Sequence, residues 1–229
     1  MTAETFVRNW ASYSTPVALR CDDGETYVVK GLQPAKPAMA HAIVLEQVLA
    51  RLGRIVGAPV PEVVLVDVPQ ALIDVEPEIA FLSAGLAHGL GLVDNCTDKI
   101  GIEAVTSDRN RQAYGRLAVL DGWGHAWRPA ADQDAGRGRG VWSVDHGLFA
   151  GGKNWTAASL AGLPSPAAPF PDLFAHADQD ALDDALLKVH AVTDDALAGV
   201  IGWVRPSWGV PTEDLVAPAK FLAGRRDTL

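Results

Sequence analysis

Asp145 stands where a short apolar run ends, in the stretch VWSVDHGLFAGG (141–152). The alternation over residues 141–146 is typical of a strand with one buried face, and an unpaired carboxylate beside such a face is costly. Its charge therefore needs a partner. Two interpretations provide one: a turn in which Asp145 caps backbone groups, or a site in which it holds a metal cation on phosphates.

Lys30 and Glu46 are two further charges that could do chemistry. Lys30 ends the apolar run TYVVK, and Glu46 lies in a helical pattern whose residues three and four positions away are all apolar. Because opposite charges in a partly buried site stabilise each other, we expect Lys30 to be the partner of Glu46. The alternative is that Glu46 extends from the edge of the apolar stripe into solvent.

The order of these three residues indicates phosphoryl transfer. This reaction needs a cation on the α- and β-phosphates, an acid that positions the cation, and a carboxylate that holds Mg²⁺. Lys30 at a strand end, Glu46 on a helix and Asp145 at a distant strand end before His-Gly meet these needs in that order. Each residue alone is a weak signal, and the order with the intervening elements is a stronger one.

Turn signals and periodicity predict the elements that position Lys30 and Glu46. Two β-branched runs, 14–21 and 25–31, flank an Asp-Gly pair and predict a hairpin. The stretch 35–59 predicts a helix, with Pro37 near its start and Gly57 and Pro59 beyond its end. A strand over 62–68 follows, so we expect a small sheet with one helix packed on it.

The rest of the chain is predicted to be mainly helical. Residues 69–106 have a weak pattern, broken by Gly85, Gly89 and Gly91, which indicates a segment joining two lobes. A helix with Ser107 as its N-cap follows, then a loop over 128–140 and the strand before Asp145. Further helices are predicted at 178–192, 193–204 and 212–229.

Composition excludes several classes of function. The chain has 229 residues and a formal net charge of −9, which argues against a nucleic-acid surface. Its two cysteines lie far apart and its six histidines show no paired ligand spacing, so no zinc site is expected. No apolar run approaches bilayer length and the N-terminus lacks the pattern of a signal peptide, so we expect a cytoplasmic protein without a membrane partner.

Four stretches of the chain, TYVVKG, LEQVLARLGRIVGAPVPEVVLVDVP, VDHG and FLAGRR, resemble the HipA-like kinase family, a bacterial branch of the protein-kinase-like fold. The resemblance covers nearly the whole chain. It implies an α+β, two-lobed fold, with a small sheet-plus-helix N-lobe over 1–88 and a mainly helical C-lobe over 89–229. ATP and Mg²⁺ would lie between the lobes, and the partners would be ATP and a protein or small-molecule phosphoryl acceptor.

The resemblance also implies residue roles. Lys30 would contact the nucleotide phosphates, with Glu46 as its helical partner, and Asp145 would be the metal-binding acid. The linker that begins near Ser83 would approach the adenine, which makes Ser83 and Gly85 candidate nucleotide contacts.

The catalytic loop departs from the family pattern of an Asp-Arg pair followed by Asn. The catalytic position falls at Trp127 or Arg128, neither of which can act as a carboxylate base, and the metal position falls near Gln133. Two interpretations follow. Either Asp132 takes over the catalytic role and Asp134 a metal-binding role through a shifted loop, or the protein is a pseudokinase that binds a nucleotide or a partner without transfer.

Overall fold

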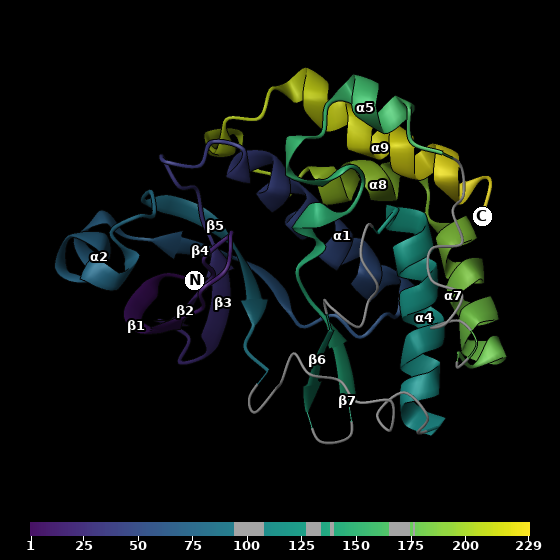
Figure 1. Ribbon diagram of the computed structural model, residues 1–229, viewed down its shortest axis with the longest axis horizontal. Helices are drawn as coiled ribbons and strands as arrows, with labels where there is room; N and C mark the ends of the chain where they lie inside the picture. The colour runs from purple at the N-terminus through teal and green to yellow at the C-terminus, as the bar shows by residue number, and fades with distance from the viewer. Residues whose placement is uncertain (94–107, 127–133, 138–139, 165–174, 176) are drawn as a thin grey trace.

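The computed structural model describes residues 1–93, 108–126, 134–137, 140–164, 175 and 177–229. The fold is α+β: an antiparallel five-stranded sheet lies at one end of the molecule and a mainly helical part at the other (Figure 1). None of the helices in these ranges combines the length and the apolar character needed to cross a membrane.

The five-stranded sheet has the order β1-β2-β3-β5-β4. Its strands are β1 (Ala3–Asn9), β2 (Val17–Cys21), β3 (Thr26–Lys30), β4 (Val63–Val68) and β5 (Gly85–Gly91). The predicted hairpin is confirmed as β2 and β3, whose turn contains Gly24 at a φ of 83°. Glycine has no Cβ and adopts such a φ at no steric cost, which explains why Gly follows Asp in this turn.

The two faces of the sheet belong to different cores. One face packs against the short helix α2 (Gln70–Val75) and the 3₁₀ turn η1 (Pro77–Ile79), through residues such as Leu19, Val66 and Ile79. Val63 and Leu90, on the opposite face, join the core of the helical part. The site residue Lys30 pairs with His88 of β5 near this second core.

Helix α1 (Met39–Val56) connects the sheet to the helical part. It is buried on nearly all sides, with 14 of its 18 residues in the interior, as expected of a helix covered on every face. It ends at Gly57, whose φ of 82° allows the left-handed cap. The predicted helix is therefore confirmed, and Glu46 lies in its middle.

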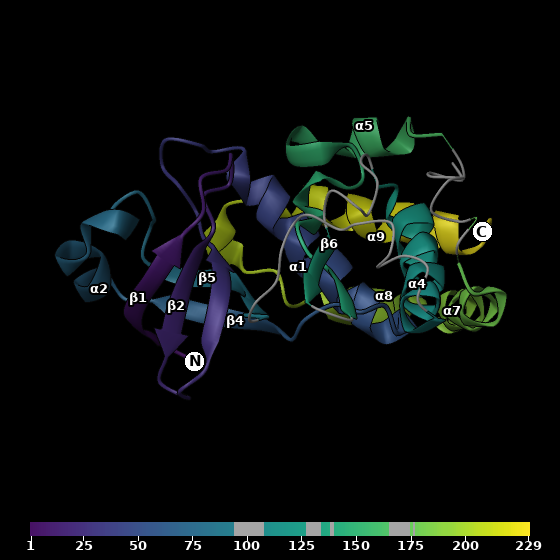
Figure 2. The ribbon, with the colours of Figure 1, turned by 60° about the horizontal axis from the view of Figure 1, so that its bottom comes forward.

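The helical part follows the predicted pattern. Helix α4 (Asp108–Gly124) packs on α7 (Gln179–Ala191), and α8 (Asp194–Ile201) packs on α9 (Thr212–Arg226), which also covers the short α5 (Ala157–Ala161) (Figures 1 and 2). A two-stranded ribbon, β6 (Asp134–Arg137) and β7 (Gly140–Ser143), leads to Asp145. Three 3₁₀ turns complete the elements: η3 (His146–Leu148), η4 (Gly152–Asn154) and η5 (Pro206–Trp208).

Two predictions about irregular segments were wrong, and one strand was missed. Residues 85–91, expected in a linker, form β5 in the interior of the sheet. A Cβ at Gly89 would lie 2.8 Å from Val64, so its glycine provides room for close packing, which the sequence pattern does not reveal. Part of the predicted loop 128–140 forms β6, and β1 had not been predicted.

Candidate active site

Lys30 is the centre of the candidate site. It is the last residue of β3, and its ammonium group is buried between two carboxylates. Nζ donates to Oε1 of Glu46 and, at 2.6 Å, to Oδ1 of Asp145. The predicted pairing of Lys30 with Glu46 is therefore confirmed, and the alternative in which Glu46 reaches solvent is wrong. Residues far apart in the chain thus meet on one ammonium group.

Glu46 also holds the turn that follows Asp145. Its Oε2 accepts a hydrogen bond from the backbone N–H of His146 at 2.9 Å, so both carboxylate oxygens have donors. The turn approaches α1 so closely that a Cβ at Gly147 would lie 3.0 Å from Oε1 of Glu46 and from the carbonyl oxygen of Ala42. The glycine of the His-Gly pair is thus explained by packing against α1.

Asp145 has an unusual backbone and an accessible carboxylate. Its φ of 64° and ψ of 49° are left-handed, which is uncommon for a residue with a side chain and typical of functional sites. The side chain makes no capping hydrogen bond, so the turn-capping interpretation is wrong. It is 49% exposed, whereas that of Glu46 is 2% exposed.

The two carboxylates share one ammonium, and their surroundings separate their pKa values. Burial lowers the pKa of Lys30, but the charges of Asp145 and Glu46 together outweigh burial and raise it above its ordinary value. The Lys30 ammonium lowers the pKa of Asp145 to about 2. Burial raises the pKa of Glu46 to about 7, although Lys30 opposes this rise. Asp145 is therefore the carboxylate that keeps its full charge at neutral pH.

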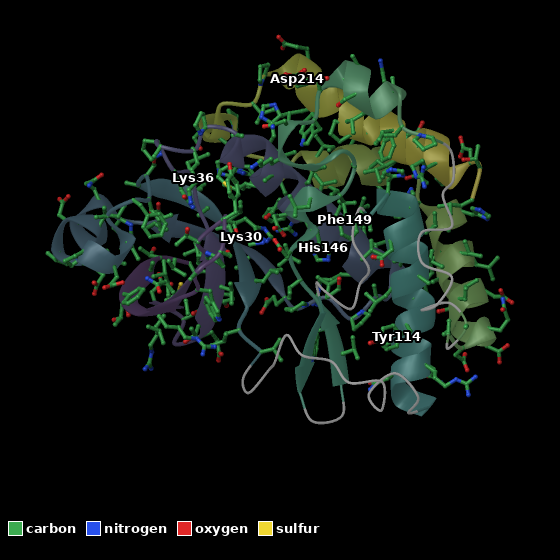
Figure 3. All side chains as sticks on the ribbon, viewed as in Figure 1. Lys30, Lys36, Tyr114, His146, Phe149 and Asp214 are labelled. Atoms are coloured by element: carbon green, nitrogen blue, oxygen red, sulfur yellow. The ribbon has the colours of Figure 1, made fainter. Side chains whose placement is uncertain are left out.

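His146 supports the turn from within the protein. Burial, reinforced by the charge of Lys30, lowers its pKa to about 3, so the imidazole is neutral. Its Nε2 lies 3.1 Å from the hydroxyl of Ser143, at the end of β7, and its ring packs edge-on against Phe149. Figure 3 shows Lys30 and His146 between the sheet and the helical part. Sequence reasoning missed these contacts, although Ser143 and His146 both stand in the pattern Ser-Val-Asp-His-Gly.

Other predicted site residues are not joined to this cluster by the described contacts. Ser83 lies just before β5, where its backbone N–H donates to the carbonyl of Leu32, and Gly85 begins β5 with a φ of 115°. No hydrogen bond or ion pair that the structure describes joins Ser83 or Gly85 to Lys30, Glu46 or Asp145. Asp134 is the first residue of β6, paired with Ser143. Trp127, Arg128, Asp132 and Gln133 lie outside the described residues.

The described side chains fit part of a nucleotide–metal site. Asp145 is ionised, half exposed and bound to Lys30 through only one oxygen, which suits a hard cation such as Mg²⁺. Among the residues whose side chains are described, no group of three acids, histidines or cysteines could hold a metal ion. A metal bound here would thus take Asp145 together with phosphate oxygens and water.

A separate cavity of about 390 Å³ lies between α5 and α9. Its lining includes Leu160, Leu163, Val216 and Phe221, and it contains none of the three clustered charges. We therefore place the candidate chemistry at Lys30 and Asp145 and not in this cavity.

Comparisons with known proteins concern the family and the fold of the chain. Residues 4–124, more than half of the chain, match the family model described as HipA-like kinase. The fold is similar to the crystal structure of a Helicobacter pylori proinflammatory kinase, CtkA, with a TM-score of 0.65 and 9% sequence identity. That similarity covers 100% of this chain and 92% of the other. No curated protein matches the sequence.

Proposed function

Because the chain belongs to the HipA-like kinase family, we propose that it is an ATP-dependent phosphotransferase that holds ATP and Mg²⁺ between its sheet and its helical part. The observation that carries the proposal is the ammonium of Lys30, which is bound by Glu46 and Asp145 at once. This arrangement provides the positioned cation and a half-exposed, ionised carboxylate, as phosphoryl transfer requires.

In this proposal each of the three residues has one task. Lys30 binds the α- and β-phosphates, and Glu46 keeps its ammonium in place through a buried ion pair. Asp145 provides a carboxylate oxygen to the metal. Bound Mg²⁺ supplies neutralisation of the charge that develops on the phosphoryl oxygens. Asp132 remains the candidate for the catalytic acid, Asp134 for a second metal ligand, and Ser83 and Gly85 for nucleotide contacts.

A second candidate function is a pseudokinase, which binds a nucleotide or a protein partner without transfer. The observation in its favour is the catalytic loop, where Trp127 or Arg128 stands at the position of the family's catalytic Asp. Positioning and metal electrostatics still accelerate transfer when a base is absent, so we place the phosphotransferase first.

The test is a thermal shift with ATP, with and without MgCl₂, followed by an assay of ADP release. A ligand at about 100 times its Kd adds about 2.7 kcal/mol, which for a chain of this size raises Tm by about 5–10 °C. We expect this shift in the wild type, its loss in Lys30→Met, and loss of its Mg²⁺-dependent part in Asp145→Asn. Lys188→Met, which breaks an exposed ion pair on α7, is the matched control and should keep the full shift.

Each outcome decides between the candidates. A wild type that ATP does not stabilise with or without Mg²⁺ would contradict a nucleotide site altogether. Stabilisation without ADP release, in the presence of candidate acceptors, would favour the pseudokinase. ADP release that Asp132→Asn abolishes would support the shifted-loop interpretation.

A further inference from the structure

Arg51 makes contacts from α1 to two other parts of the protein. It lies five positions after Glu46 on the same helix, and its guanidinium carbon is 3.8 Å from the ring centre of Trp203, just after α8. Its Nη2 donates at 3.3 Å to the carbonyl of Val63, the first residue of β4. One cation thus links α1, the sheet and the chain between α8 and α9.

A buried amide extends this link towards Lys30. In one orientation of its side-chain amide, Gln47 makes hydrogen bonds through both its nitrogen and its oxygen. The nitrogen donates to Nδ1 of His88 at 2.7 Å, and the oxygen accepts from Nε and Nη2 of Arg51 at 2.7 and 3.0 Å. Burial, which lowers the pKa of His88 far below its ordinary value, keeps that ring neutral and able to accept at Nδ1. His88 is paired with Lys30 in the sheet. The consecutive residues Glu46 and Gln47 therefore hold neighbouring residues of β3 and β5.

Trp208 attaches the beginning of β5 to the helical part. Its indole Nε1 donates to the carbonyl of Leu86 at 2.6 Å, and the side chain is buried. Leu86 lies two residues before His88, in the part of β5 that pairs with β4 and not with β3. In Figures 1 and 2 the chain between α8 and α9 turns back to the sheet, beside β5 and α1.

We propose that Arg51 and Trp208 are positioning residues that fasten the sheet to the helical part and so hold Glu46 against Lys30 before any ligand binds. This proposal rests on the proposed function, because the two residues would control nucleotide affinity at the same site. A site assembled in advance does not lose binding free energy to its own ordering. The chain between α8 and α9 (residues 202–211) then sets nucleotide affinity without contacting the nucleotide.

The experiment compares Arg51→Met and Trp208→Phe with the wild-type chain of 229 residues by hydrogen exchange and by ATP titration in the presence of Mg²⁺. Both variants should exchange faster in α1 and β5, without a change in α7. Their ATP affinity should be about fivefold weaker, the order of effect expected from one cation–π contact or hydrogen bond.

Two controls separate positioning from general stability. Arg8→Met removes another guanidinium–tryptophan contact, that of Arg8 on Trp10 at 4.4 Å, at the end of β1. Val189→Ala truncates a buried side chain of α7 and lowers the stability of the helical core. Both should keep wild-type ATP affinity at a temperature at which every variant is folded.

Unchanged exchange in α1 and β5 of both variants would overturn the proposal. The proposal would also fail if Arg51→Met and Trp208→Phe exchanged faster throughout the protein and had the same ATP affinity as Val189→Ala. Arg51 and Trp208 would then only stabilise the fold. If the wild type does not bind ATP, the proposed function fails, and the exchange measurement still decides whether the two residues hold α1 to the sheet.

Discussion

Replacement of Lys30 by Met tests the physical basis of the site most directly. Among the contacts that the structure describes, the change leaves the buried Glu46 with only the backbone N–H of His146 as a donor and Asp145 with no cation. Removing one partner of a buried ion pair typically costs about 3–5 kcal/mol, because the other charge stays buried without compensation. We expect a loss of this order in the free energy of unfolding at pH 9.

The pH dependence of this loss follows from Glu46. Its pKa in the folded wild type is about 7, above the ordinary value of 4.5, so the folded state binds its proton more tightly and loses stability as pH rises towards 7. Without Lys30 the folded pKa is higher still. The loss relative to wild type should therefore grow above pH 7, by at most about 1.4 kcal/mol for each pH unit, and be smaller at pH 6.

Urea unfolding of both proteins between pH 6 and pH 9 measures this dependence. Lys188→Met is the control: both members of its ion pair with Asp184 are exposed, so we expect a small loss that is the same at pH 6 and pH 9. The double variant Lys30→Met/Glu46→Gln should recover much of the stability at pH 9, because it removes the buried charge. An equal loss at pH 6 and pH 9, or no recovery in the double variant, would refute the reasoning.

Two further predictions concern close packing and a buried acid. Gly147→Ala should lower Tm by several degrees in calorimetry, because its Cβ would press on Ala42 and Glu46. Overpacking of this kind costs about 1–3 kcal/mol. Gly199→Ala is the control: its Cβ would point into open space on α8, so it should not lower Tm. Equal Tm values for the two variants would show that the turn has room for a methyl group. Burial raises the pKa of Asp121 well above its ordinary value, so this acid reduces stability as pH rises. Asp121→Asn should therefore unfold at higher urea than wild type at pH 8 and gain less at pH 4, and parallel pH profiles would argue against a buried acid.

The pairing of Lys30 with Glu46 could be predicted because the local sequence leaves both charges without partners. Glu46 has only apolar neighbours along its helix, and such a charge must find a partner in another element or reach solvent. The hairpin, α1 and the helices of the second half also follow from local signals. Asp-Gly pairs, stop signals and apolar periodicity act over a few residues, so the sequence alone contains them.

The contacts that Gly147, His146 and Gly89 make could not be predicted in this way. The glycine of His-Gly is needed because α1 passes 3.0 Å from where a Cβ would lie, and Gly89 is needed because β4 packs on it. β5 was taken for a linker because its three glycines have low intrinsic strand propensity, which burial between β3 and β4 overrides.

The sequence by itself determined the elements of this protein and the three charges that need partners. Only the tertiary structure decided how those charges share their environment: Asp145 keeps an exposed oxygen while Glu46 is enclosed, so one ammonium lowers the pKa of the first and cannot offset the burial of the second. The reason is physical. Propensity and spacing act along the chain, whereas burial and electrostatic interaction depend on the elements that the fold brings around each group.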